Sequence, residues 1–194
     1  MLKIGVVYEG VGDTEIVKVL LTKILKEQEF SIVKDIANHT GIIGFTRVYA
    51  RQLFEVDQVD VAVFLTDQDV PPDRDDRHKR IKEEIEKVNV GYLEFSAIGV
   101  PNPHLEHWLL QDESVLKRIF SLNHEARVPH ADLLAKSQLK ALWSEMPTPK
   151  LSMRETLLRI VNEMSLDLML ECPDFRLFHG ELINATRRAA SSNS

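Results

Sequence analysis

The sequence contains a single cysteine, Cys172, in 194 residues. One cysteine excludes an internal disulfide and a zinc site built from several thiolates. The N-terminal segment has too few apolar residues for a signal peptide and no apolar run is long enough to span a bilayer, so we expect a cytoplasmic protein. Basic residues are too few to balance the acids, since 24 Lys and Arg against 30 Asp and Glu give a net charge of −6. That balance disfavours binding of nucleic acid by bulk charge alone.

Hydrophobic residues make up 44% of the chain and charged residues 28%. This is the composition of a soluble globular protein and not of a disordered one. The charge is unevenly distributed, because residues 1–113 hold 21 acids and 13 bases, whereas residues 114–194 hold 9 acids and 11 bases. The first part of the chain is therefore acidic and the second part mildly basic.

Short apolar segments alternate with helical patterns in the acidic part of the chain. We expect strands at residues 4–8, 30–36, 59–65 and 90–98. Helical patterns follow these segments at residues 16–25, 46–54, 73–88 and 105–110. Because continuous apolar runs are typical of strands buried on both faces, the alternation predicts an α/β fold with a mostly parallel sheet flanked by helices.

The strand signal fades after Ser114. Helical patterns continue at residues 115–122, 132–144 and 152–164. We therefore assign residues 1–113 to an α/β core and residues 114–186 to a helical extension packed on that core. The last residues, 187–194, are two arginines followed by small polar and alanine residues, and we expect them to form a disordered tail.

Three acids come directly after predicted strands: Glu9 after the first, and Asp67 and Asp69 after the third. Ligands of open α/β sheets bind beyond the carboxyl ends of the strands. The Asp-x-Asp spacing lets two carboxylates face one cavity, and Mg²⁺ prefers such oxygen ligands while it keeps waters for a phosphate substrate. The alternative is that these acids are loop residues that cap helices.

These residues carry a resemblance to a known family. Glu9-Gly10 after the first strand, with Asp67-Gln68-Asp69 after a later one, resembles the Toprim signature of topoisomerases, bacterial primases and OLD-type nucleases. Thr14-Glu15 is similar to the end of the "E-G-x-T-E" opening of uncharacterised Toprim-like families, including the DUF4276 and RloB-like groups. This chain departs from that opening by an insertion of residues 11–13, which leaves the role of Glu15 open.

Two later segments are similar to motifs of the same uncharacterised families. Residues 103–110 follow the pattern "P-x-x-E-x-W-L-L", and residues 172–178 are close to "S-P-S-F-x-x-F". The resemblance therefore extends from residue 9 to about residue 180, which is most of the chain. It implies a Rossmann-like Toprim fold with a C-terminal helical cap.

The resemblance also implies phosphodiester chemistry. By motif, Glu9 takes the general acid-base role, while Asp67 and Asp69, together with Glu9, hold Mg²⁺ or Mn²⁺. Glu106 is a further candidate ligand, and its alternative is a helix-start acid favoured by the helix dipole. The implied function is a metal-dependent nuclease or related enzyme that acts on DNA or RNA, in defence against foreign nucleic acid, with an ATPase as a partner.

Four residues are candidates for substrate contacts. Gly10 and Glu15 belong to the family-like opening, and Lys136 and Lys140 lie one helical turn apart in the basic part of the chain. A lysine pair of this kind suits contact with a phosphate backbone. The alternative for the lysines is a solvated surface helix without a ligand.

Other interpretations remain open at this point. His104, Glu106 and His107 suit a transition-metal site, although exposed histidines at a helix start are the simpler interpretation. Cys172 has no obvious base partner and we interpret it as structural. The Asp-x-Asp pair also occurs in haloacid dehalogenase phosphatases, and residues 10–12 form half of a dinucleotide fingerprint. A small-molecule phosphatase and a non-catalytic module that binds a partner protein or nucleic acid are the alternative functions.

Overall fold

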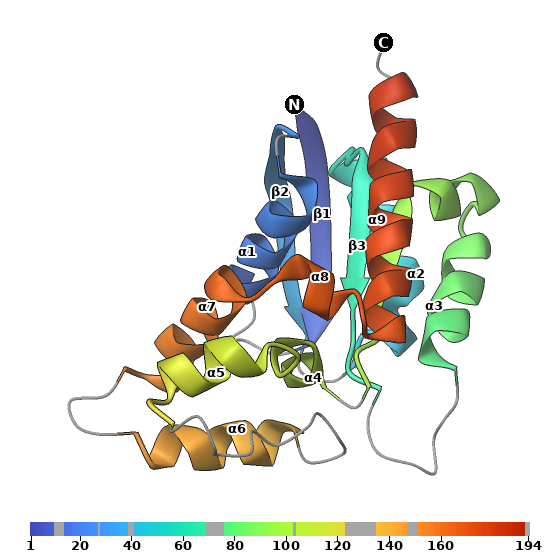
Figure 1. The fold of residues 1–194 in the computed structure, drawn as a ribbon. Coiled ribbons are helices and arrows are strands. Elements are labelled where there is room, and N and C mark those ends of the chain that lie inside the picture. Colours follow the sequence, from blue (N-terminus) through green and yellow to red (C-terminus); the bar gives the residue numbers. More distant parts are fainter. Residues whose placement is uncertain are drawn as a thin grey trace.

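The protein is an α/β structure built on a four-stranded, all-parallel sheet, as the alternating pattern predicts (Figure 1). The computed structural model describes residues 1–9, 14–26, 28–38, 41–68, 76–102, 104–122, 135–146 and 151–192. The strands, in the spatial order β2-β1-β3-β4, are β1 Leu2–Glu9, β2 Phe30–Asn38, β3 Val61–Leu65 and β4 Ser96–Gly99. This arrangement is Rossmann-like.

Side chains of the central strands alternate between two cores, one on each face of the sheet. Ile4, Val6 and Tyr8 of β1 pack into a core with the helices α1 (Thr14–Leu25) and α9 (Pro173–Ser192). Val7, between them, packs into a second core on the opposite face. All five residues of β3 are buried because helices cover both faces, and this explains its uninterrupted apolar sequence.

The second core is covered by α2 (Thr46–Arg51), the π-helical turn Gln52–Val56 and α3 (Arg77–Glu86). In Figure 1, α1 and α9 lie in front of the strands and α2 lies behind them. The π-helical turn approaches β1 closely at Gly5, where an added Cβ would lie 2.5 Å from Cδ2 of Leu53. A side chain at position 5 would therefore force the buried side chain of Leu53 to move.

The remaining helices are α4 Leu105–Leu109, α5 Glu113–Ile119, α6 Ala135–Ser144, α7 Met153–Glu163 and α8 Leu166–Met169. Helices α4, α5 and α6 lie at the end of the sheet where β1 and β3 terminate (Figure 1). Helix α7 packs on α1 and begins with a capping box formed by Ser152 and Glu155. The helical patterns predicted after Ser114 are confirmed for the described residues.

The predicted strand at 90–98 is wrong over most of its length. Residues Val90–Phe95 form a 3₁₀ helix, η3, and only Ser96–Gly99 is a strand. The side chain of Asn89 accepts a hydrogen bond from the Gly91 N–H at 2.9 Å, which starts the turn. Tyr92 then stacks on Phe54, with ring centroids 4.3 Å apart. This local turn and the aromatic contact override the strand propensity of the segment.

The predicted disordered tail is also wrong for residues 187–192, because α9 continues to Ser192. Ala189 is only 3% exposed and belongs to the same core as α1. Helix α9 packs along β4 and η3, so it is a layer of the α/β core itself. Not even this 20-residue helix, the longest one described, is apolar enough to cross a membrane.

Candidate functional site

The candidate site lies where the strand order reverses. Strand β2 pairs with one edge of β1 and β3 pairs with the other, so the connections that leave β1 and β3 diverge at their carboxyl ends. This is the topological switch point at which open α/β sheets bind ligands. Glu9 is the last residue of β1, and Asp67 follows β3 by two residues. Both line one small cavity of about 10 Å³ between the two strand ends.

The carboxylate of Glu9 is held by the segment that follows β2. Its Oε1 accepts a hydrogen bond from the Ile42 N–H at 3.1 Å. Gly41 has a φ of +89°, and a Cβ at that position would lie 3.4 Å from Glu9 Oε1. The left-handed backbone of Gly41, which few residues other than glycine adopt, brings the chain close to this carboxylate.

Asp67 is held by the start of α4. Its Oδ1 accepts a hydrogen bond from the Leu105 N–H at 3.1 Å, and its Oδ2 lies 3.1 Å from Nδ1 of His104. Burial raises the pKa of Asp67 above its ordinary value; His104 opposes this shift and the nearby charge of Glu106 adds to it. A positive charge near this carboxylate would therefore favour its ionised form.

Arg77, the first residue of α3, connects the two strand ends. Its Nη1 donates to the backbone oxygen of Asp67 at 2.7 Å and to Oγ1 of Thr66 at 3.4 Å, and it lies 3.8 Å from Oε2 of Glu9. The side chain is only 18% exposed. Sequence reasoning missed this residue because it lies in the charged run 73–80, which is typical of a solvated helix face.

The structure places other predicted site residues outside this cavity. Glu15 is half exposed and pairs with Arg154 at 2.9 Å. Lys140 is exposed on α6. Glu106 does not line the cavity, but its charge acts on Asp67. Asp69, Gly10 and the side chain of Lys136 lie outside the described residues.

The donor set at the switch point suits a hard divalent cation. Glu9 and Asp67 offer carboxylate oxygens, which Mg²⁺ and Mn²⁺ prefer. The cavity of about 10 Å³ that they line is on the scale of a single ion or water molecule and is far too small for a substrate. Glu9, Asp67 and Glu106 do not bring three donor atoms close together in the described part of the chain. The predicted third ligand, Asp69, lies outside the described residues.

In the described part of the chain, one set of three potential metal ligands does lie close together. His107, Cys172 and Asp174 offer donor atoms that all lie within 4.8 Å of one another. The simpler interpretation of the segment 104–107 predicted exposed histidines at the helix start. Both histidines are instead partly buried. His104 turns toward Asp67, whereas His107 joins Cys172 and Asp174. Sequence reasoning had no local signal for this group, because 65 residues separate its first two members.

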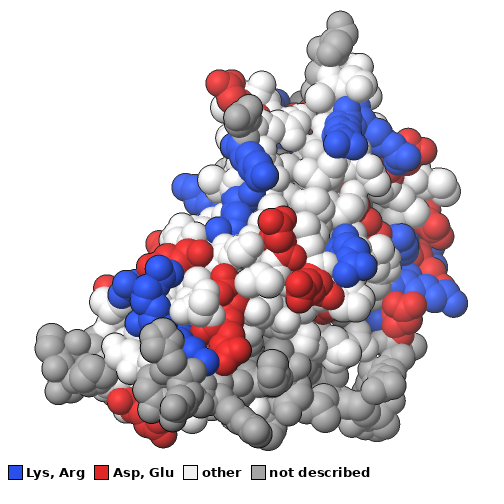
Figure 2. Space-filling model, in the orientation of Figure 1, with Lys and Arg blue, Asp and Glu red and all other residues white. Residues whose placement is uncertain are grey.

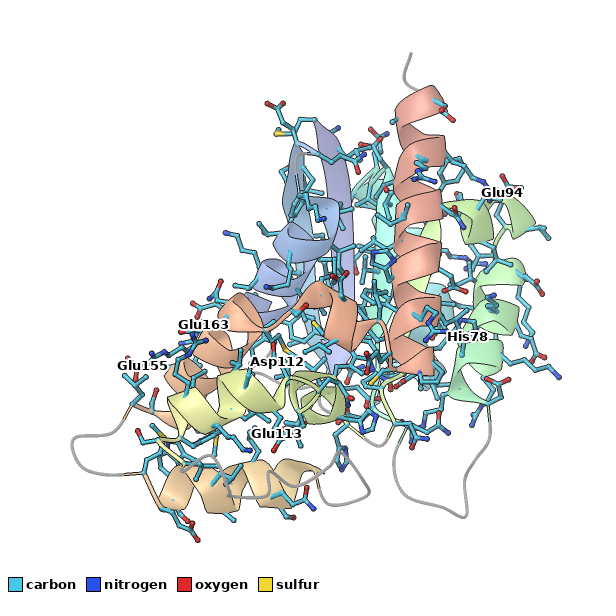
Figure 3. All side chains as sticks on the ribbon, viewed as in Figure 1. His78, Glu94, Asp112, Glu113, Glu155 and Glu163 are labelled. Carbon is cyan, nitrogen blue, oxygen red and sulfur yellow. The ribbon has the colours of Figure 1, made fainter. Side chains whose placement is uncertain are left out.

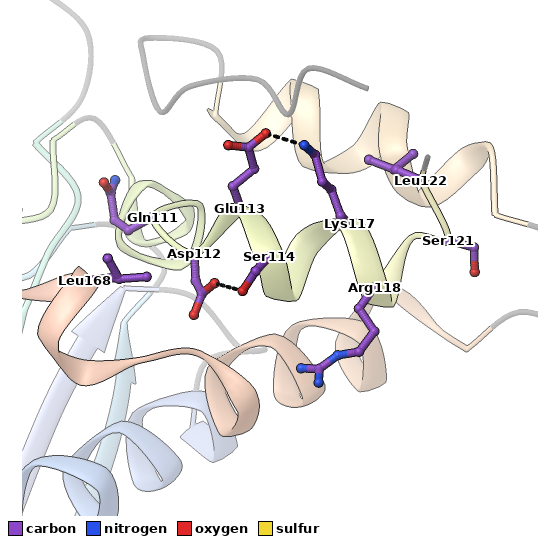
Figure 4. A pocket seen from close by; sticks show the side chains of 9 residues that line it. All are labelled: Gln111, Asp112, Glu113, Ser114, Lys117, Arg118, Ser121, Leu122 and Leu168. Carbon is purple, nitrogen blue, oxygen red and sulfur yellow. Dashed lines mark hydrogen bonds and ion pairs between the residues drawn. The ribbon is translucent and has the colours of Figure 1, made fainter. Parts of the chain in front are cut away.

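A larger cavity, of about 870 Å³, lies along α5 (Figure 4). Its charged side chains already have partners: Lys117 pairs with Glu113 at 2.8 Å, and Arg118 pairs with Glu163 at 2.5 Å. Asp112 caps α5 by accepting from the Val115 N–H. Because these charges stabilise the local structure, the groove is a weaker candidate for chemistry than the switch point.

Surface charge is mixed in sign on the face shown in Figure 2, where basic and acidic side chains are interspersed over α7 and α9. No broad basic field covers the described part of this face, so bulk charge there does not favour a polyanion.

No protein-family model, curated protein or solved structure matches this chain. The Toprim resemblance therefore remains a prediction from the motifs at residues 9–15, 67–69, 103–110 and 172–178.

Proposed function

We propose that this protein is a Mg²⁺- or Mn²⁺-dependent nuclease of Toprim type whose active site is the switch point of the sheet. One observation carries the proposal: Glu9 and Asp67, at the ends of adjacent parallel strands, line the same cavity, and Arg77 contacts both strand ends. Carboxylates that can hold a metal ion and a guanidinium that can bind phosphate are groups that suit phosphodiester cleavage.

Asp67 and Glu9 would hold the ion, with Asp69 as the further ligand that the Toprim resemblance implies. A bound divalent cation neutralises the charge that develops on the phosphoryl group. Asp67 is oriented for this role by the N–H of Leu105 and by His104, which fix both of its oxygens. These contacts hold the carboxylate in place before substrate binds, which lowers the reorganisation needed during the reaction.

Glu9 is the residue that would move the proton. Its carboxylate lies at the carboxyl end of β1, and the side chain is 21% exposed, so water can reach it. A general acid or base must reach the reacting oxygen directly or through one water. The Ile42 N–H holds Oε1, which leaves Oε2 on the side of Arg77.

Arg77 would bind a phosphate oxygen. Its guanidinium carries a permanent positive charge beside the carboxylate of Glu9, and a local cation of this kind favours a polyanionic substrate on a chain whose overall charge is −6. The contacts to the backbone oxygen of Asp67 and to Thr66 hold the guanidinium beside both strand ends.

The test is a cleavage assay on single-stranded DNA, double-stranded DNA and RNA with Mg²⁺ or Mn²⁺. Glu9→Gln and Asp67→Asn are expected to abolish metal-dependent cleavage. Glu15→Gln is the matched control, because this glutamate pairs with Arg154 outside the cavity, and it is expected to cleave like the wild type.

Other outcomes separate the alternatives. Turnover of a small phosphate ester that Asp67→Asn abolishes, without cleavage of any nucleic acid, identifies a phosphatase. Binding of nucleic acid without turnover identifies a binding module. No metal-dependent cleavage, or full activity of the Glu9→Gln protein, contradicts the proposal.

A further inference from the structure

A second candidate metal site involves α4 and the start of α9. It consists of His107 in α4, Cys172 just before α9, and Asp174 in the first turn of α9. Their nitrogen, sulfur and oxygen donors lie within 4.8 Å of one another. The mixture of donors differs in kind from the all-oxygen set at the switch point.

Aromatic packing brings α4 and the start of α9 together. Trp108 contacts Phe175 edge-on and stacks on Phe178, with centroid distances of 5.0 and 5.6 Å. All three rings are fully buried. The residues next to these rings in the sequence, His107 and Asp174, are thereby held close to each other by the core.

Asp174 is fixed in orientation. Its Oδ2 accepts hydrogen bonds from Nε1 of Trp108 at 2.8 Å and from the Asn102 N–H at 3.0 Å. Carboxylate ligands of metal ions are usually held by outer hydrogen bonds of this type, which keep the ligand in place before the ion arrives.

His107 has a polar atom that needs a partner. Its Nδ1 is buried and has no hydrogen-bond partner among the described residues. Buried polar atoms of side chains are nearly always hydrogen-bonded or bound to an ion or water, so this nitrogen calls for an explanation. A metal ion held by the neighbouring thiol and carboxylate supplies one.

Cys172 is the only cysteine of the chain and is 4% exposed. Burial, helped by the acids Asp174 and Glu171, raises the pKa of its thiol to about 12. A buried thiol of this kind is poorly placed to act as a nucleophile or a redox sensor. The remaining roles are a packing residue and a ligand that loses its proton when a cation binds.

We propose that His107, Cys172 and Asp174 form a binding site for a divalent transition-metal ion of the zinc class. Imidazole, thiolate and carboxylate are the protein ligands of Zn²⁺, and thiolate is a poor ligand for Mg²⁺. Three protein ligands leave a fourth position for water. Asp174 also lines a surface cavity of about 450 Å³ with Gln68 and Asn102, which gives the ion a route from solvent. The bound ion ties α4 to α9.

The test is titration of the metal-free full-length protein with Co²⁺, a spectroscopic substitute for Zn²⁺. A thiolate-to-cobalt charge-transfer absorption is expected that reaches its maximum at about one Co²⁺ bound at this site per chain, and that Zn²⁺ removes and Mg²⁺ does not. Because the chain has one cysteine, this absorption has one source. Cys172→Ser is expected to abolish it, and His107→Ala and Asp174→Asn to weaken Co²⁺ binding at least about tenfold.

Two variants serve as controls. Glu171→Gln changes an acid next to Cys172 without removing a ligand, and Glu9→Gln changes the switch point, so both are expected to retain the absorption. Circular dichroism checks that each variant is folded. If Asp174→Asn unfolds because Trp108 loses its acceptor, Cys172→Ser and His107→Ala still decide the question. The absence of a charge-transfer absorption in the wild type, or unchanged Co²⁺ affinity in folded His107→Ala protein, overturns the proposal.

Discussion

The two groups of candidate ligands beside α4 present opposite chemical situations. At the start of α4, the Leu105 N–H and His104 satisfy the carboxylate of Asp67, and across the cavity the Ile42 N–H and Arg77 hold Glu9. Within α4, Nδ1 of His107 is buried without a partner among the described residues, and the imidazole lies close to a buried thiol. The first group is a set of hard oxygen donors already oriented by the protein, and the second is a mixed set whose nitrogen lacks a partner.

This difference indicates two separate tasks. Oriented oxygen donors with a neighbouring guanidinium suit the binding of Mg²⁺ and a phosphate. A nitrogen, sulfur and oxygen set beside the aromatic core suits a tightly held ion that stabilises the junction of α4 and α9. The two sites should therefore fail independently when their ligands are changed.

The largest expected effect is that a substitution in one site abolishes the signal of that site and leaves the signal of the other site intact. Asp67→Asn is expected to abolish metal-dependent cleavage, because the catalytic ion loses a carboxylate ligand, while it leaves the cobalt–thiolate absorption intact. Cys172→Ser is expected to do the reverse in the same two assays. If either variant loses both signals while it remains folded, the two sites are one coupled unit and the comparison is wrong.

Trp108→Ala removes a ring from the aromatic packing that holds His107 close to Asp174. Removing this fully buried ring is expected to lower the free energy of unfolding by about 3–5 kcal/mol, and to remove the hydrogen bond to Asp174. Denaturant unfolding measures the change. Trp143→Ala, at a partly buried tryptophan on α6, is the matched control and is expected to have a clearly smaller effect.

The position of α9 against the sheet depends on a second carboxylate, Glu181. Its Oε2 accepts a hydrogen bond from the Ile98 N–H at 2.9 Å, and its Oε1 contacts His78 and Lys82 of α3. Figure 3 shows His78 on the side of α3 that faces α9. Burial opposes ionisation of Glu181, but these hydrogen bonds outweigh it and hold its pKa below the ordinary value.

Because the folded-state pKa of Glu181 is lowered, its contribution to stability is present above the unfolded value of about 4.3 and is lost as the pH falls through the folded value. Glu181→Gln is therefore expected to lower the free energy of unfolding by about 1–3 kcal/mol at neutral pH and to reduce its loss in acid. Unfolding curves between neutral and acidic pH measure this. Glu94→Gln, in an exposed pair with Arg188, is the control. Parallel pH curves for Glu181→Gln and the wild type would contradict the assignment.

The smallest expected effect concerns Glu15. Its half-exposed ion pair with Arg154 predicts that Glu15→Ala changes the free energy of unfolding by less than about 1 kcal/mol. Cleavage is expected to remain unchanged, because the side chain lies outside the cavity. A large loss of activity in the folded variant would show that Glu15 takes part in cleavage and would contradict this placement.

The sequence allowed much of the fold and part of the site to be predicted. Strands β1 and β3 were recognisable because burial on both faces requires continuous apolar runs, and Glu9 and Asp67 follow from where those runs end. Residues 90–95 are also rich in apolar side chains but form a 3₁₀ helix, because the side chain of Asn89 starts a turn that periodicity does not reveal.

The parts of the two candidate sites that were not predicted from the sequence depend on tertiary contacts. Arg77 looked like one member of a solvated charged run, and its role appears only when α3 begins beside the switch point. Cys172 looked like a structural thiol, since nothing near it in the sequence suggests His107 as a neighbour. Spacing along the chain can predict groups that share a strand end, but not groups that the aromatic core brings together.

The most direct test of metal binding at the switch point is a crystal of the protein soaked with Mn²⁺, with anomalous diffraction data. Anomalous density is expected between the carboxylates of Glu9 and Asp67, and its loss is expected in Asp67→Asn crystals. Absence of density there, with Glu9 still held by the Ile42 N–H and Asp67 still held by His104, would contradict a metal-dependent active site at the switch point.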